Sequence, residues 1–118
     1  MQKVTLYFLE RPDIKINIEL YFDESGQLIL DGYDIGKSVK DFKGDSDYEY
    51  TITIEPKEVK KLYGIFGLKL YNRQALLEAI KERFGVNIAY SLFGEFLKSH
   101  GIEYSSFTYN WTIQCLRK

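Results

Sequence analysis

The 118-residue chain is poor in the side chains that most often carry chemistry, with one cysteine, Cys115, and one histidine, His100. A single cysteine cannot close a disulfide within the chain, which is typical of proteins in a reducing compartment. Zinc sites built from several cysteines and histidines are excluded. Cys115 shares its alternating face with Trp111 and Ile113, which predicts a buried, unreactive thiol rather than half of a catalytic pair with His100.

Sequence motifs of the common enzyme classes are also missing. The chain has no GxSxG, P-loop, GxGxxG, HExxH or CxxC motif, so we expect no cofactor and a non-enzymatic protein. No apolar run approaches the roughly 20 residues that span a bilayer, and the first residues lack the pattern of a signal peptide. These absences predict a cytoplasmic protein without a membrane partner. A pI near 5.9 and the lack of a basic-aromatic run disfavour nucleic acid as a partner.

What the chain does have is strong strand periodicity. In residues 14–23 apolar side chains alternate strictly with polar ones, which predicts a strand with one buried and one solvated face. Shorter patterns predict strands at residues 4–9, 28–30 and 48–54, and a hairpin loop at residues 23–27. A last strand is expected from residue 106 onward. If the strands align, the polar face carries hydroxyls and tyrosines, namely Tyr21, Thr51, Thr53, Thr108, Asn110 and Thr112.

The apolar period changes to that of a helix after Pro56. Pro56 is favourable in a first helical turn, and the stripes that follow predict three helices, beginning near Pro56, Asn72 and Ile88. Glycines are expected in the left-handed conformation that ends each helix, at Gly67, Gly85 and Gly101. We therefore predict one α+β domain over residues 1–118. It has an antiparallel sheet of about five strands, three helices packed on one face, and the order β-β-β-β-α-α-α-β.

Charge is segregated along the chain although the net charge is −1. Residues 19–55 carry a net charge of −7, and residues 56–118 carry +5. The acidic part includes residues 31–50, which follow neither a strand period nor that of a long helix, apart from a short helical turn predicted at 37–42. Segments that break the pattern of a domain are where binding residues concentrate. The candidate partner-binding residues are Asp31, Tyr33, Asp34, Asp41, Asp45, Asp47 and Glu49.

Two functions follow from this acidic, tyrosine-rich segment. Tyrosine buries a large area at low entropy cost and hydrogen-bonds at its rim, so a tyrosine-rich acidic surface favours a protein partner. The alternative is a metal-binding protein or small metal-dependent enzyme, because Asp45, Asp47 and Glu49 alternate and would share one face of an extended chain. A homodimer without another ligand is a third possibility.

Two short runs carry a resemblance to known proteins. They are Asp31-Gly32-Tyr33-Asp34-Ile35-Gly36 and Gly44-Asp45-Ser46-Asp47-Tyr48-Glu49-Tyr50. Together they resemble a group of small bacterial proteins of uncharacterised function, a likeness that extends to Gly101-Ile102. The layout is also similar to small immunity-type proteins of bacterial toxin systems. The resemblance implies an inhibitor that binds a toxin, and it supplies no catalytic residue.

Overall fold

The computed structural model describes residues 2–36 and 46–110, with the backbone alone described for Ser46, Asp47 and Asn110. The elements are β1 (Lys3–Arg11), β2 (Ile14–Phe22), β3 (Leu28–Gly36), β4 (Ser46–Ile54), α1 (Pro56–Ile65), α2 (Arg73–Phe84), α3 (Ala89–Ser99) and β5 (Ser105–Asn110). This order confirms the predicted α+β class and the sequence β-β-β-β-α-α-α-β.

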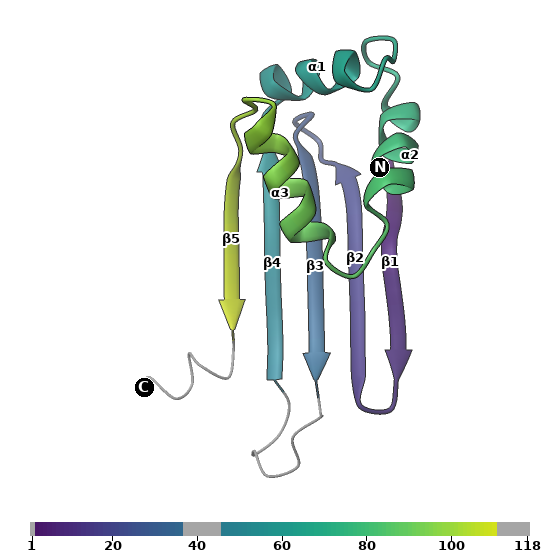
Figure 1. The fold of residues 1–118 in the computed structure, drawn as a ribbon, viewed down its shortest axis with the longest axis vertical. Coiled ribbons are helices and arrows are strands. Elements are labelled where there is room, and N and C mark those ends of the chain that lie inside the picture. The colour runs from purple at the N-terminus through teal and green to yellow at the C-terminus, as the bar shows by residue number, and fades with distance from the viewer. Residues whose placement is uncertain (1, 37–45, 111–118) are drawn as a thin grey trace.

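The five strands form one antiparallel sheet in which spatial order follows chain order, β1-β2-β3-β4-β5. Tight turns join β1 to β2 and β2 to β3, whereas β4 and β5 are neighbours although all three helices lie between them in the chain (Figure 1). The sheet therefore combines local hairpins with one long-range pairing at its β5 edge.

The core lies between the helices and one face of the sheet. In β2 the buried positions are Ile16, Ile18, Leu20 and Phe22, and the residues between them are partly or fully exposed. The helices bury their predicted stripes, including Leu62, Leu76, Leu77, Ile80, Phe93 and Leu97. Helix α2 lies against β1 and α3 against β4, over one face of the sheet (Figure 1). The three helices thus leave the opposite face of the described sheet uncovered.

Strand β3 is longer than the sequence pattern predicted. The lack of periodicity assigned to residues 31–50 is wrong for 31–36, which pair with 46–51 across the β3–β4 ladder, whereas the strand predicted at 48–54 is confirmed. The pattern is broken at Gly32, where a side chain would collide with the ring of Tyr50. A glycine in a strand often marks such a close approach. The turn predicted at 37–42 lies outside the described residues.

Two of the three predicted helix-ending glycines are confirmed. Gly67 and Gly101 both have φ of 68°, and the N–H groups of the residues after them, Leu68 and Ile102, close the helix ends. The prediction for Gly85 is wrong, since its φ is −79°. A Cβ there would lie 2.8 Å from Lys81 O and 3.0 Å from Leu6 O. Glycine is favoured at this position because a side chain would meet backbone oxygens of both α2 and β1, not because the helix ends in a left-handed turn.

Candidate functional site

The uncovered face of the sheet brings acidic and aromatic side chains together. The register places Glu19 of β2 directly opposite Asp31 of β3, and Tyr33 of β3 opposite Glu49 of β4. Odd and even positions of a strand point to opposite faces, so these side chains lie on the face away from the helices. We call this surface the open face and define it by Glu19, Tyr21, Asp31, Tyr33, Glu49, Phe107 and Tyr109.

Like charges are crowded on the open face. Burial, followed by the nearby Glu19 and Glu49 carboxylates, raises the pKa of Asp31 above its ordinary value, and Lys3 opposes the shift. Lys3 Nζ lies 3.3 Å from Glu19 Oε1, so one of the carboxylates has a cationic partner. The pKa of Tyr21 is also raised, first by burial and then by Asp31. Because like charges directly opposite each other destabilise a sheet, this arrangement opposes folding.

Aromatic side chains border the carboxylates at the β5 edge. The rings of Phe107 and Tyr109 are stacked, with centroids 6.2 Å apart and planes inclined by 13°. Phe107 is 57% exposed, and Tyr109 lies opposite Glu49 in the ladder. Aromatic residues are enriched at protein interfaces relative to the rest of the surface, so this stacked pair marks a candidate contact area.

The assignment of β5 faces from sequence was wrong. Thr108 was expected on the polar face, but it pairs with Tyr50, whose side chain points toward the helices. Phe107 and Tyr109 therefore lie on the open face. The alternation in β5 is confirmed. Which of the two alternating sets lies on the open face depends on the pairing of Thr51 with Phe107, and no local pattern encodes this pairing.

Asp34 lies on the other face of the sheet from Asp31. Its Oδ1 accepts a hydrogen bond of 2.8 Å from the Tyr50 hydroxyl. Burial raises the pKa of Asp34, although the hydrogen bond from Tyr50 opposes the shift. Burial and the neighbouring Asp34 raise the pKa of Tyr50 as well. The ring of Tyr50 also contacts Tyr48 and Tyr90, at centroid distances of 5.7 and 5.0 Å. Asp34 is thus part of a tyrosine cluster on the helix-bearing face.

The structure divides the predicted site residues into three groups. Asp31, Tyr33 and Glu49 come together on the open face, and Asp34 lies on the opposite face. Asp41 and Asp45 lie outside the described residues, as does the side chain of Asp47. The sequence prediction missed four open-face residues, Glu19, Tyr21, Phe107 and Tyr109. The alternation of residues 14–23 already placed Glu19 and Tyr21 on a solvated face, but their pairing with Asp31 required the register.

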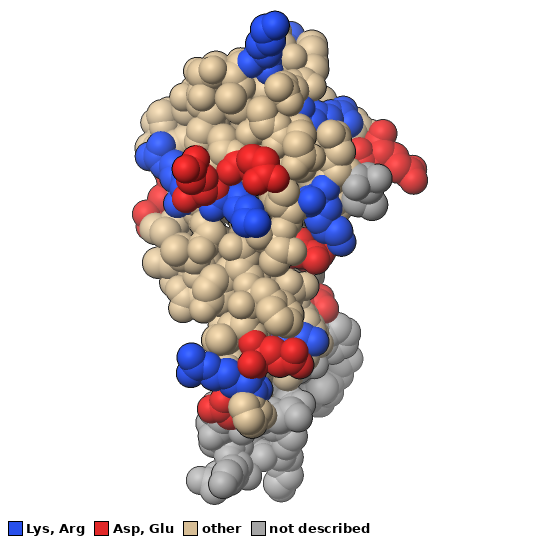
Figure 2. Space-filling view, turned by 90° about the vertical axis from the view of Figure 1, so that its right-hand side faces the viewer, with Lys and Arg blue, Asp and Glu red and all other residues tan. Residues whose placement is uncertain are grey.

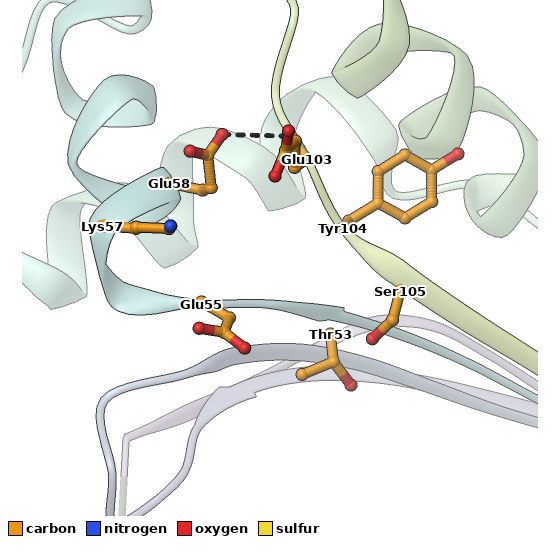
Figure 3. A pocket seen from close by; sticks show the side chains of 7 residues that line it. All are labelled: Thr53, Glu55, Lys57, Glu58, Glu103, Tyr104 and Ser105. Carbon is orange, nitrogen blue, oxygen red and sulfur yellow. Dashed lines mark hydrogen bonds between the residues drawn. The ribbon is translucent and has the colours of Figure 1, made fainter.

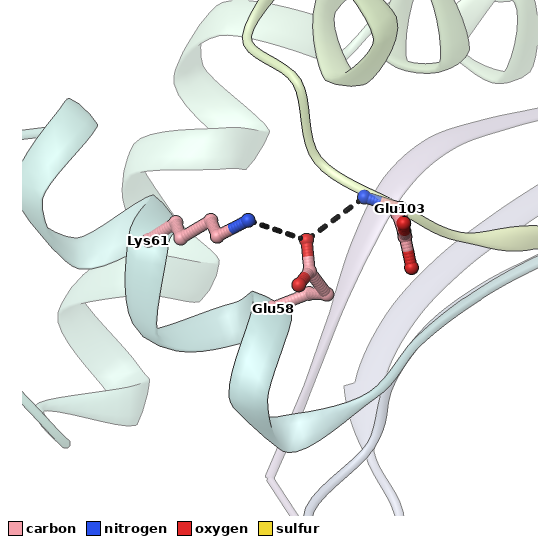
Figure 4. A network of polar contacts seen from close by, with 3 residues as sticks. All are labelled: Glu58, Lys61 and Glu103. Atoms are coloured by element: carbon pink, nitrogen blue, oxygen red, sulfur yellow. Dashed lines mark hydrogen bonds and ion pairs between the residues drawn. The ribbon is translucent and has the colours of Figure 1, made fainter.

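A separate polar pocket of about 250 Å³ lies between α1, β4 and the start of β5. It is lined by Thr53, Glu55, Lys57, Glu58, Glu103, Tyr104 and Ser105, and Figure 3 shows their side chains around it. One of its carboxylates has a structural role. Glu58 Oε1 accepts hydrogen bonds from the backbone N–H of Glu103, at 2.9 Å, and from Lys61 Nζ, at 3.0 Å (Figure 4). These bonds lower the pKa of Glu58, the Glu103 N–H contributing most.

This network joins α1 to the segment that leads into β5. The Glu58 side chain is only 10% exposed, and its donors come from the same helix and from a residue 45 positions away. Because its carboxylate is already engaged, we interpret the pocket as a by-product of this junction. His100, the one histidine, packs its ring 4.4 Å from that of Phe96 at the end of α3, whereas Cys115 lies outside the described residues.

Comparison with known proteins identifies no relative of this chain. No protein-family model, curated protein or solved structure matches the chain, so the resemblance to immunity-type proteins stays a prediction. None of the helices within residues 2–36 and 46–110 combines the length and the hydropathy of a membrane-spanning segment. The same residues contain no group of three or more histidine, cysteine, aspartate or glutamate side chains that could hold a metal ion. The function is therefore proposed from the geometry of this chain.

Proposed function

We propose that this protein is a non-enzymatic binding domain whose open face recognises a positively charged surface of another protein. The observation that carries the proposal is the pairing of Glu19 with Asp31, with Glu49 close by. A sheet gains stability from opposite charges at such positions and loses it from like charges. Local arrangements that oppose folding concentrate at functional sites, and a cationic partner would relieve this one.

The side chains around the carboxylates indicate the chemistry of that partner. Arginine forms two parallel hydrogen bonds with a carboxylate and stacks its guanidinium plane on aromatic rings. The open face offers both kinds of contact, since Asp31 and Glu49 lie among Tyr33, Phe107 and Tyr109. We therefore expect an arginine-rich protein surface to bind more tightly than a lysine-rich one. A nuclease-type toxin has the required charge, in keeping with the immunity-type layout.

A matched pair of triple variants tests the proposal. Glu19→Gln, Asp31→Asn and Glu49→Gln together neutralise the open face. Glu78→Gln, Glu82→Gln and Glu95→Gln remove the same charge from exposed positions of α2 and α3. A partner captured from the native lysate by the wild-type protein should bind the open-face variant at least about tenfold more weakly, and the helix variant normally. Its affinity for the wild type should fall as salt rises.

The outcome is interpretable because the open-face variant relieves repulsion and should fold at least as well as the wild type. Urea denaturation of both variants verifies this. Equal binding by the two triple variants, or a partner whose contact surface is acidic, would contradict the proposal.

A further inference from the structure

Strand β1 forms one edge of the sheet, with β2 as its hydrogen-bonded neighbour among the described residues. Its charges lie at its ends, with Lys3 at one end and Glu10 and Arg11 at the other, and residues 4–9 are uncharged. Figure 2 looks onto this side of the molecule and shows a broad band of uncharged side chains between an upper and a lower group of charged ones. A long edge strand without internal charges is a template for pairing with another strand.

The backbone of β1 offers hydrogen-bonding groups at defined positions along this edge. The N–H of Phe22 donates to Gln2 O at 3.2 Å, so Gln2 faces β2, and the alternation of an antiparallel ladder turns Lys3 and Thr5 outward. The register then shifts between Thr5 and Tyr7, where Leu6 is the extra residue of a β-bulge. Beyond the bulge the outward positions are therefore Phe8 and Glu10.

The bulge makes β1 complementary to itself. The outward residues are spaced symmetrically about Leu6 and Tyr7, and all four of their side chains lie on the open-face side of the sheet. Two antiparallel copies related by a two-fold axis through the bulge bring Lys3 opposite Glu10 of the second copy, and Thr5 opposite Phe8. Without the extra residue, Lys3 and Glu10 would point to opposite faces, because they are an odd number of positions apart.

We propose that two copies of this chain associate through β1 and form one continuous ten-stranded sheet. The occupant of the edge is a second copy because the edge matches itself in charge and in side-chain pairing. Each Lys3 meets a Glu10, and each Phe8, 54% exposed here, packs on a β-branched Thr5. Opposite charges and aromatic–β-branched pairs are both favourable at directly opposed strand positions.

The helix layers are compatible with this arrangement. Helix α2 lies beside the first part of β1 (Figure 1). In the antiparallel pair the β1 strand of the second copy runs in the opposite direction. Each α2 therefore lies beside the far end of the other copy's β1. Isologous contacts of this kind are the commonest route to dimers.

Charge reversal distinguishes the proposed pairing of Lys3 with Glu10 from a non-specific contact between edge strands. Lys3→Glu places glutamate opposite Glu10 twice, and Glu10→Lys places lysine opposite Lys3 twice. We expect a dimer for the wild type in light scattering over a concentration series. For each variant alone, the dimer dissociation constant should rise by roughly tenfold or more. A mixture of the two variants should dimerise again, because both pairs are then of opposite charge. Lys60→Glu, on the exposed surface of α1, is the control for net charge.

A proline variant tests the backbone contribution separately. Thr5→Pro removes an outward N–H and leaves the β1–β2 ladder intact, as prolines at edge strands do, so it should give a folded monomer. Circular dichroism verifies the fold of each variant. A monomeric wild type at every concentration would overturn the proposal, and so would dimers that persist in the single charge variants or that fail to re-form in the mixture.

Discussion

At the scale of single residues, Asp31 faces Glu19 across the β2–β3 ladder, with Glu49 diagonal to it on β4. The pKa of Asp31 is raised by burial and by these two carboxylates. The folded protein therefore binds a proton at Asp31 more tightly than the unfolded chain does. The contribution of Asp31 to stability is largest below the ordinary aspartate pKa and is lost as the pH rises through its folded pKa.

Replacing Asp31 by asparagine should stabilise the protein near pH 7. We expect the free energy of unfolding to rise by about 0.5 kcal/mol, the size of a cross-strand charge pair that is partly screened by water. The gain should disappear near pH 3, where aspartate is protonated in both states. Urea denaturation at the two pH values measures the difference. Glu82→Gln on α2 is the control, and an equal gain there would show that net charge alone is responsible.

Gly32 provides a second test at the residue scale. An added Cβ would overlap the ring of Tyr50, whereas at Gly36, four residues along the same strand, it would meet nothing within 4 Å. Gly32→Ala should lower the free energy of unfolding by about 1–3 kcal/mol, as overpacking of a core does. Gly36→Ala should leave it nearly unchanged. Comparable losses from the two substitutions would indicate that strand propensity, not the Tyr50 contact, sets the requirement for glycine.

At the scale of elements, the sequence predicted which segments form helices and strands, and in what order. It predicted less well which side of a strand faces solvent and where a strand ends. The alternation in residues 14–23 predicted β2 and its solvated side, including Glu19 and Tyr21. Strand β3 was cut short because Gly32 and Asp34 interrupt the apolar pattern. Both residues contact Tyr50 on the neighbouring strand. The Tyr50 ring lies over Gly32, and the Tyr50 hydroxyl donates a hydrogen bond to Asp34. The partner strand supplies this information, so a single strand's sequence cannot reveal it.

The sequence indicated only part of the open face for the same reason. Asp31 and Tyr33 were grouped from the acidic, tyrosine-rich composition of residues 31–50, and the structure places both on the open face because residues two apart in a strand share a face. Asp34 was grouped with them only because β3 was not recognised as continuous. Phe107 and Tyr109 were missed since an exposed aromatic face in an edge strand has the same period as a core face. Only the pairing register of the strand shows whether such a face is buried or exposed, and the register depends on contacts between distant segments.

Glu58 joins two elements, and its replacement should separate them. Glu58→Gln loses the ionised acceptor of the Glu103 N–H and of Lys61, so we expect a lower melting temperature at neutral pH. Because the pKa of Glu58 is lowered in the folded protein, its contribution is present above the ordinary glutamate pKa and is lost as the pH falls through the folded pKa. Thermal melts of wild type and variant should therefore converge in acid. Glu55→Gln, an exposed neighbour in the same pocket, should change little, and a similar loss there would contradict the assigned role of Glu58.

At the scale of the whole molecule, the charge segregation of the sequence distinguishes the middle of the sheet from the helices. The part with a net charge of −7, residues 19–55, includes β3 and β4, and the part with +5, residues 56–118, includes the three helices and β5. The proposed dimer axis is perpendicular to the sheet, so both open faces would point to the same side. A partner with two basic patches would then bind both copies at once, which raises its overall affinity without a new contact.

The position of β5 also has a consequence for how the chain reaches its native state. Strands β1 and β2, and β2 and β3, meet through short turns, so their pairing closes small loops. Strand β5 pairs with β4 only after residues 55–104 have folded back. Contacts between distant segments form slowly because the entropy of closing the long loop is lost before the contacts contribute any favourable energy. We expect β5 to be the last strand to join during folding and, with its stacked Phe107 and Tyr109, the strand that completes the recognition surface.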